Sequence, residues 1–219
     1  MRLFLSGGGS EKKSIILDKK FARELDKSKS LLYIPIAIDK AKHSYPECFK
    51  WISSIFNPLG VNSIVLWTEQ DLERRKEIDL KKFSGIYIGG GNTYYLLKEL
   101  KNSGFLENLK KLIEMDFPVY GGSAGAIILG KDIRTSSDEN EVNLKDFSGL
   151  DLVRGYSIFC HYDKETKWAR EFLKEEKLKT IALPEDCGLF VTDDKIEVIG
   201  AGSAYLPDKK TTLKPGQVI

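Results

Sequence analysis

One stretch of the chain, residues 119–129, organises the interpretation of the rest: Val119-Tyr120-Gly121-Gly122-Ser123-Ala124-Gly125-Ala126-Ile127-Ile128-Leu129. It starts as the apolar end of a strand, passes through a serine flanked by glycines, and continues into an apolar segment that can form a helix. Residues 121–125 read G-x-S-x-G, the pattern of a strand-to-helix elbow that exposes a serine hydroxyl above a sheet. So sharp a turn strains the serine backbone, and side chains on its neighbours would clash.

The pattern by itself leaves two interpretations. It is short and arises by chance, so it also fits a helix start, rich in glycine and alanine, that packs closely on a strand. In the functional interpretation, the first N–H groups of the following helix face the place where an oxyanion would form. The rest of the chain has to decide between them.

Apolar and helical segments alternate on the N-terminal side of this stretch. We expect strands at residues 2–5, 31–36, 61–66, 85–88 and 117–120, and helices at 15–25, 45–59, 93–100 and 104–115, with a charged, partly helical connector at 71–83. Such alternation predicts a mostly parallel sheet with helices on both faces, an α/β fold of three layers. Active sites of such sheets lie outside the carboxyl ends of the strands, where the glycine clusters after residues 88 and 120 fall.

The pattern changes after residue 129. Residues 131–145 are polar and loop-like, residues 156–161 form a short apolar strand that ends at a histidine, and residues 166–177 have the spacing of an amphipathic helix. A strand at 180–183 follows. Two further short strands, 188–192 and 196–199, flank a polar turn, which predicts a small antiparallel hairpin at the edge of the sheet.

Composition narrows the class of protein. With 219 residues and a net charge of +2, we expect one domain and no nucleic-acid or membrane partner. The chain shows neither a secretory signal nor an apolar run of membrane-spanning length. Its three cysteines lack metal-ligand spacing, and Lys12 stands where a dinucleotide-binding G-x-G-x-x-G would need glycine. We therefore expect a cytoplasmic protein without metal or organic cofactor; its oligomeric state is not readable from the sequence.

A nucleophilic serine needs a base, and the base needs an acceptor that orients it. The chain has two histidines. His43 lies in a polar loop and is expected to be solvated, whereas His161 ends a predicted strand in the half of the chain that contains Ser123. Candidate acids are Glu185, also at a strand end, and Asp138, in the polar loop. Taken alone, a histidine at such a position is more often a structural residue than a base.

Four motifs, in chain order, carry a family resemblance: Ile86-Tyr87-Ile88-Gly89-Gly90-Gly91-Asn92-Thr93, Gly121-Gly122-Ser123-Ala124-Gly125-Ala126, Ile133-Arg134-Thr135 and Cys160-His161-Tyr162. With these motifs the chain resembles the peptidase E family, serine peptidases of family S51 that include aspartyl dipeptidases and are related to cyanophycinase. The resemblance implies the flavodoxin-like architecture of class I glutamine amidotransferases, which use a cysteine at the elbow where this chain has a serine.

The resemblance also implies roles for individual residues. Ser123 matches the nucleophile and His161 the base. Glu185 matches the glutamate that orients the histidine, and Asp138 matches an aspartate that is also proposed as catalytic. We prefer Glu185, because a strand end holds a carboxylate more rigidly than a polar loop does.

The oxyanion hole implied by the resemblance consists of the backbone N–H groups of Gly91 and Ala124. Gly91 suits this role because it has no side chain to keep a substrate carbonyl away from its amide. The neighbouring Asn92 is a candidate substrate contact. Its alternative role is the N-cap of the next helix.

Substrate preference is where the resemblance is weakest. In aspartyl dipeptidases an arginine-containing segment after the histidine binds the acidic side chain of the substrate. Arg170 matches one of these arginines, Lys167 stands where another would be, and Trp168 departs from the pattern. A lysine cannot form the two-pronged arginine–carboxylate contact. Lys167 and Arg170 could instead belong to the solvated face of a helix.

These observations predict a serine exopeptidase that hydrolyses dipeptides or short peptides through an acyl-enzyme, with an N-terminal aspartate as one candidate preference. Two alternatives stay open. One is a non-catalytic protein that binds a small ligand on the same fold. The other is a hydrolase of another amide or of an ester, since the same triad serves any activated acyl group.

Overall fold

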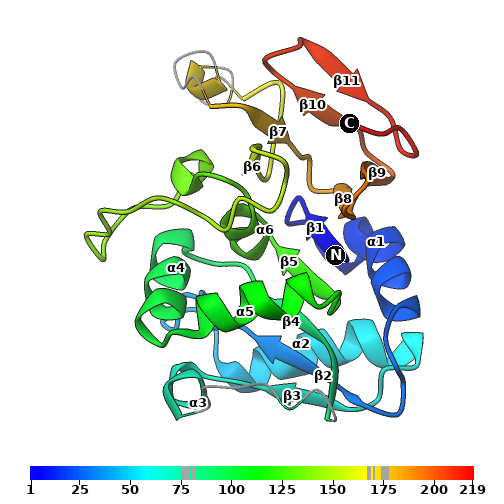
Figure 1. Cartoon of the computed structure of the whole chain (residues 1–219), viewed down its shortest axis with the longest axis vertical. Coiled ribbons are helices and arrows are strands. Elements are labelled where there is room, and N and C mark those ends of the chain that lie inside the picture. Colours follow the sequence, from blue (N-terminus) through cyan, green and yellow to red (C-terminus); the bar gives the residue numbers. More distant parts are fainter. Residues whose placement is uncertain (75–78, 80–81, 167–168, 170, 174–177) are drawn as a thin grey trace.

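A computed structural model describes residues 1–74, 79, 82–166, 169, 171–173 and 178–219 (Figure 1). The helices and 3-10 turns in this part of the chain are α1 (Glu11–Arg23), α2 (Tyr45–Phe56), η1 (Asn57–Leu59), α3 (Glu69–Arg74), α4 (Thr93–Asn102), α5 (Phe105–Glu114), α6 (Ala124–Leu129) and η2 (Ile133–Thr135). The strands are β1 (Leu3–Ser6), β2 (Ser30–Ile34), β3 (Ile64–Leu66), β4 (Phe83–Ile88), β5 (Val119–Gly122), β6 (Ser157–Phe159), β7 (Thr180–Ala182), β8 (Cys187–Val191), β9 (Ile196–Gly200), β10 (Ala204–Leu206) and β11 (Thr211–Leu213).

The larger sheet has seven strands in the order β3-β2-β4-β5-β1-β8-β9. The first five are parallel to their neighbours, and β8 and β9 are antiparallel. The predicted mostly parallel sheet is therefore confirmed, and so is the antiparallel hairpin at its edge. Because neighbouring parallel strands end on the same side, the segments after β1, β4 and β5 meet at one edge of the sheet.

Side chains that alternate along the strands build an apolar core on each face of this sheet. Phe4 and Tyr120 point to one face, where they pack with buried residues of α1 and α2. Leu5, Ile88 and Val119 belong to the other core, which includes buried residues of α4, α5 and α6. A period of two with both faces apolar is what a parallel strand covered on both sides requires. Three layers result, as Figure 1 shows.

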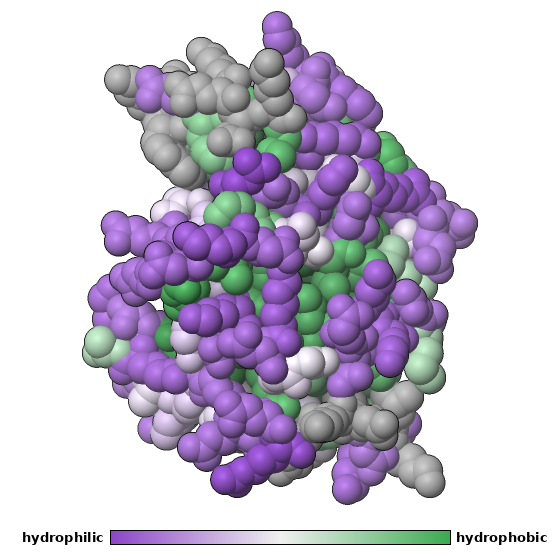
Figure 2. Space-filling model, turned by 60° about the vertical axis from the view of Figure 1, so that its left-hand side comes forward, coloured by the Kyte–Doolittle hydropathy of each residue, from purple (hydrophilic) through white to green (hydrophobic). Residues whose placement is uncertain are grey.

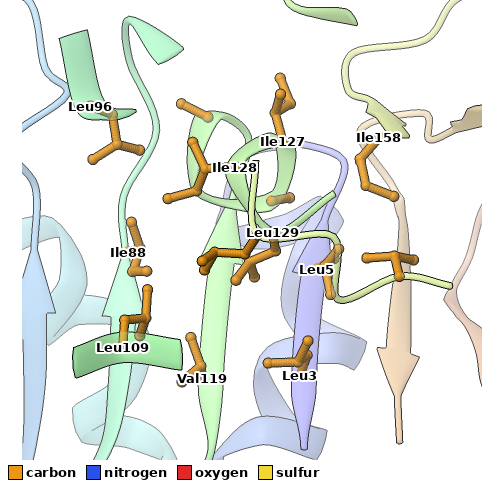
Figure 3. Close-up of a cluster of buried hydrophobic side chains, with 14 of the residues drawn as sticks. Leu3, Leu5, Ile88, Leu96, Leu109, Val119, Ile127, Ile128, Leu129 and Ile158 are labelled. Atoms are coloured by element: carbon orange, nitrogen blue, oxygen red, sulfur yellow. The ribbon is translucent and has the colours of Figure 1, made fainter. Parts of the chain in front are cut away.

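Helix α6, which follows the serine, is buried along its whole length. In Figure 3 its residues Ile127, Ile128 and Leu129 lie among side chains of the strands and of α4 and α5, including Ile88 and Leu109. A helix so enclosed cannot shift without opening the core. The sequence after the serine thus anchors the elbow.

A second sheet, in the order β11-β10-β7-β6, stands at the upper end of the molecule in Figure 1. Strands β6 and β7 are parallel, and β10 pairs antiparallel with both β7 and β11. The strands at 156–161 and 180–183 were predicted, but the sequence analysis did not place them in a separate sheet and did not predict β10 and β11. These last two strands have three residues each, and β11 has no buried residue.

Some boundaries differ from the expected ones. Helix α1 begins at Glu11 instead of residue 15, and the helix expected to reach residue 59 ends at Phe56. Residues 57–59 form a 3-10 turn instead, because Pro58 has no N–H to continue the helix and Gly60 takes up a φ of 84°. Of the helix expected at 166–177, residues 169 and 171–173 are helical. Most of the remainder lies outside the described residues.

The surface is largely hydrophilic. Figure 2 shows hydrophobic residues gathered at the middle of the face that is turned forward, between hydrophilic side chains. In the part of the chain that the structure describes, no helix combines the length and the apolarity needed to cross a bilayer.

A buried carboxyl group lies behind the elbow. Asp18 of α1 is 1% exposed and accepts hydrogen bonds of 2.8 Å from the Tyr120 hydroxyl and the Ser14 hydroxyl. Tyr120 stacks on Tyr87, their ring centroids 4.4 Å apart. Burial raises the pKa of Asp18 to about 6, against the effect of its two hydrogen bonds. The fold therefore favours the neutral form of this carboxyl group.

This shift predicts a pH-dependent contribution to stability. Because the folded-state pKa of Asp18 lies above the unfolded value, folding is favoured at low pH and loses stability as pH rises from about 4 to about 6. The Asp18→Asn variant is neutral at every pH. As pH rises from about 4 to about 6, its free energy of unfolding should therefore increase by up to about 3 kcal/mol relative to that of wild type. Urea unfolding of both proteins at pH 4 and pH 7 measures this difference. The exposed Asp208→Asn variant serves as the control. The prediction would be contradicted if the difference in unfolding free energy between Asp18→Asn and wild type were the same at both pH values.

Candidate active site

Ser123 lies in the turn between β5 and α6. Its φ is 50° and its ψ is −111°, a conformation that costs energy for any residue with a side chain. The turn is held on both sides: the Ser123 N–H donates to the Ser6 carbonyl at 3.2 Å, and the Ser123 carbonyl accepts from the N–H groups of Ala126 and Ile127. The strained elbow that the G-x-S-x-G pattern predicts is present.

Two glycines of the pattern allow backbone segments to approach each other. A Cβ on Gly121 would lie 2.5 Å from the carbonyl carbon of Gly125, and a Cβ on Gly125 would lie 2.4 Å from the Ile88 carbonyl oxygen. Real Cβ contacts are never this short. The close packing of β5, α6 and β4 therefore depends on these glycines.

His161 follows β6 and reaches the serine. Its Nε2 is 2.8 Å from Ser123 Oγ. The His161 backbone has a φ of 53°, and its N–H donates to the Gly7 carbonyl at 2.9 Å. Both Ser123 and His161 thus have positive φ values and are each held by the end of β1.

Glu185 follows β7 and contacts the other side of the imidazole. Its Oε1 is 3.1 Å from His161 Nδ1, and its Oε2 accepts a 2.7 Å hydrogen bond from Lys13 Nζ. These contacts, that with Lys13 first and that with His161 second, lower the pKa of Glu185 below its ordinary value. The carboxylate is therefore available as an acceptor. Lys13, which the sequence analysis did not single out, is one of several similar lysines in the first helix.

Asp138 lies elsewhere in the site. Its Oδ2 accepts hydrogen bonds from the Thr93 N–H (2.7 Å), the Thr93 hydroxyl (2.7 Å) and the Ser136 hydroxyl (2.6 Å). These bonds tie the polar loop to the start of α4. The structure brings Glu185, and not Asp138, to the Nδ1 atom of His161.

Glycines also shape the space around the serine. Gly8 has a φ of 98°, and a Cβ there would lie 2.4 Å from His161 Cε1 and 3.0 Å from Ser123 Cβ. Gly91 has a φ of 131°, and a Cβ there would lie 1.9 Å from the Ala37 carbonyl oxygen. Within the described residues, neither the Gly91 N–H nor the Ala124 N–H has a hydrogen-bond acceptor. Gly91 also lines the cavity beside Ser123, whereas Ala124 is fully buried.

Ser123 and His161 open into a cavity of about 810 Å³. This volume suits a small ligand. Its wall carries apolar groups such as Ile127 and polar groups such as Asp138 and Lys40. The lining consists of residues 37–41, 91–93, 95, 123, 127, 135–138, 141–142, 160 and 161.

Asn92 lines this cavity and also caps α4. Its Oδ1 accepts from the Tyr95 N–H at 2.9 Å, and its Nδ2 donates to the Glu139 carbonyl at 2.9 Å. The N-cap alternative for Asn92 is therefore present in the structure. The other two candidate substrate contacts, Lys167 and Arg170, lie outside the described residues, as does Trp168.

No group of three or more potential metal ligands of the His, Cys, Asp or Glu type occurs among the residues that the structure describes. Cys48, Cys160 and Cys187 are buried and form no disulfide. Cys160 lies beside the site, its Sγ 3.6 Å from both the Ser6 and the Ser123 carbonyl oxygens, and burial raises the pKa of its thiol. A thiol that stays protonated is a poor nucleophile.

Comparison with known proteins shows the family of the chain. The family model for peptidase family S51 matches residues 3–199. The chain belongs to peptidase family S51. The sequence motifs indicated the same family, which consists of serine-type peptidases.

Relatives in family S51 carry the name peptidase E. The chain is similar to the peptidase E of a Shewanella species, with 33% identity over 138 residues, or 58% of each chain. The match thus spans somewhat over half the length of that relative. The peptidase E of Shewanella denitrificans is 28% identical over 190 residues, which cover 82% of this chain and 78% of the relative.

A solved structure supports the fold. The crystal structure of a peptidase from an acI-B1 actinobacterium superposes with a TM-score of 0.71 at 19% identity. The superposition covers 100% of this chain and 96% of that one. The three-layer α/β arrangement is therefore shared with a known peptidase.

The space left by Gly8 generates a prediction. Gly8→Ala should displace His161 from Ser123 and lower the rate at which a fluorophosphonate labels Ser123 roughly hundredfold, since a 1 Å misplacement can cost this much. The matched control is Gly60→Ala: Gly60 also has a positive φ, of 84°, but a Cβ there meets nothing within 4 Å. Both variants should lose about 1 kcal/mol from backbone strain. Equal labelling rates in the two variants would show that Gly8 does not set the Ser123–His161 contact.

Proposed function

We propose that the protein is a serine exopeptidase that hydrolyses dipeptides or short peptides, with Ser123 as nucleophile, His161 as general base and acid, and Glu185 as the residue that orients His161. The observation that carries this proposal is the contact of 2.8 Å between Ser123 Oγ and His161 Nε2, made by a serine on a strained elbow. Membership of family S51 supports it.

In the proposed reaction, Ser123 Oγ attacks the scissile carbonyl carbon while His161 Nε2 takes the hydroxyl proton. The tetrahedral intermediate collapses, the C–N bond breaks, and the same proton passes from His161 to the leaving amine. Water then attacks the acyl-enzyme with His161 again as base, which releases the acid and restores the serine. Glu185, an acceptor at Nδ1, keeps Nε2 unprotonated in the resting enzyme and stabilises the imidazolium.

The negative charge that develops on the substrate carbonyl oxygen during attack needs hydrogen-bond donors to stabilise it. We assign this role to the N–H groups of Gly91 and Ala124, which have no acceptor within the described part of the chain. The left-handed backbone of Gly91 and its missing side chain are consistent with an amide that faces the cavity.

The cavity supports a short substrate with a free amino terminus. Its volume of about 810 Å³ lies in the range of pockets that bind small molecules. Carboxylates of Asp138 and Glu141 line it and would attract an N-terminal ammonium. The ammonium of Lys40, also in the lining, is 2.6 Å from Glu69 Oε1, so its charge is largely offset. This distribution of charge favours a substrate whose N-terminal residue has a neutral side chain. A preference for an acidic side chain would require Lys167 or Arg170 to bind it.

A panel of dipeptides and aminoacyl p-nitroanilides tests the proposal. Wild type should hydrolyse members of the panel, and Ser123→Ala should lower kcat by at least about 10³-fold while the fold is retained. Cleavage confined to Asp-X peptides would assign Lys167 or Arg170 to substrate recognition. Undiminished activity of folded Ser123→Ala would overturn the mechanism.

Failure of the wild type on every peptide would reject the peptidase proposal. Labelling of Ser123 by a fluorophosphonate would then separate the two remaining possibilities. A labelled serine would indicate a hydrolase of another amide or of an ester, and an unlabelled one a protein that binds a small ligand without catalysis.

A pair of variants distinguishes the two candidate acids. Glu185→Gln should lower kcat by about 10²- to 10³-fold, because an amide cannot stabilise the imidazolium as a carboxylate does. Asp138→Asn should mainly raise KM and lower stability, because Asp138 fixes the cavity wall to α4 through Thr93 and Ser136. Steady-state kinetics and urea unfolding of both variants measure these effects. A larger loss of kcat in Asp138→Asn than in Glu185→Gln would make Asp138 the third member of the triad.

A further inference from the structure

We infer that Lys13 is a positioning residue that acts on His161 through Glu185. This inference rests on the proposed function of Ser123, His161 and Glu185. It extends the hydrogen-bonded row by one residue, from Ser123 through His161 and Glu185 to Lys13.

The contacts assign one partner to each oxygen of the carboxylate. Glu185 Oε1 faces His161 Nδ1 at 3.1 Å, and Glu185 Oε2 accepts from Lys13 Nζ at 2.7 Å. Lys13 belongs to the first turn of α1 and Glu185 to the loop between β7 and β8, 172 residues apart in the chain. A carboxylate held at both oxygens has its plane and its rotamer defined.

Such a second contact matters here because Glu185 is not enclosed. Its side chain is 41% exposed, and that of Lys13 is 52% exposed. A carboxylate buried in a core is held by its surroundings, whereas an exposed one explores several rotamers and meets water. Lys13 supplies the restraint that burial would otherwise provide.

The backbone brings the two residues together. A Cβ on Gly9 would lie 2.4 Å from the Glu185 carbonyl oxygen and 2.7 Å from Lys13 Cβ. The missing side chain at Gly9 therefore lets the first turn of α1 approach the Glu185 loop. That loop is fixed in turn by the Asp186 carbonyl, which accepts from the N–H groups of Ala201 and Gly202.

Lys13 also offsets the charge that faces His161. The contact with Lys13 is the larger of the two that lower the pKa of Glu185. Other charged groups border the same hollow beside Glu185: Asp186, Asp163 and Lys164. Without Lys13, the negative charge of Glu185 acts on the imidazole uncompensated and favours its protonated form.

An exposed ion pair contributes little to stability, so the effect of Lys13 should appear in catalysis and in its pH dependence. Lys13→Met keeps an unbranched, largely apolar side chain and removes the charge. It should lower kcat about fivefold with little change in KM, and move the acid limb of the kcat/KM profile upward by about half a pH unit. Lys13→Arg should restore both values to near wild type.

The matched control is Lys12→Met. Lys12 is exposed, lies in the same helical turn, and has no side-chain hydrogen bond or ion pair with the described residues. Its substitution should leave kcat and the pH profile unchanged. The comparison removes any general effect of the net charge of α1.

Kinetics of the four proteins on the peptide that wild type cleaves best, from pH 5 to pH 9, measure these effects. Where wild type cleaves no peptide, the rate of fluorophosphonate labelling of Ser123 over the same pH range replaces kcat. A wild-type rate and profile in Lys13→Met would overturn the inference and leave the proposed function intact. An equal change in Lys12→Met, or no restoration in Lys13→Arg, would also overturn it. If Ser123 of the wild type itself did not react, the proposed function would be rejected instead.

Discussion

The site depends on backbone hydrogen bonds at the end of β1. The Ser6 carbonyl accepts from the Ser123 N–H, the Gly7 carbonyl accepts from the His161 N–H, and the Gly7 N–H donates to the Cys187 carbonyl. Two consecutive residues thus join the elbow to His161, which follows β6 of the smaller sheet, and to Cys187, where β8 begins after the Glu185 loop. Since main-chain groups have few degrees of freedom, the distance between serine and histidine is set by the backbone.

Close approach at this junction leaves no room for side chains. A Cβ on Gly7 would lie 2.0 Å from the Pro184 carbonyl oxygen, and one on Gly8 would lie 2.4 Å from the imidazole. The strain at Ser123 and His161, both with positive φ, persists because the buried helix α6 and these hydrogen bonds hold the turns in place. Energy from the apolar core therefore maintains an arrangement that neither turn would adopt alone.

Helix α1 places two carboxyl groups in opposite environments. Toward the core it carries Asp18, whose pKa is raised by burial behind Tyr120. Toward the site it carries Lys13, whose ammonium lowers the pKa of Glu185. One carboxyl group is thus kept neutral more easily than in water and the other is kept ionised. Surroundings, and not residue type, decide this difference.

Elements with long apolar patterns were predictable. The parallel strands, the helices that cover them and the hairpin of β8 and β9 follow from periodicity, because both faces of the sheet are buried. Strands β10 and β11 were not predicted, since each has three residues and β11 has no buried side chain. The separate sheet formed by β6, β7, β10 and β11 was missed for the same reason.

The sequence by itself determined the family through its four motifs. With the family it indicated the serine elbow, which the short G-x-S-x-G pattern alone left open. It also favoured His161 over His43 as the base. Only the tertiary structure decided which carboxylate meets His161 and that Lys13 meets the carboxylate. Both contacts join segments far apart in the chain. The strand-end position favoured Glu185 over Asp138 without deciding between them, and no local pattern distinguishes Lys13 from Lys12 before α1 packs against the Glu185 loop.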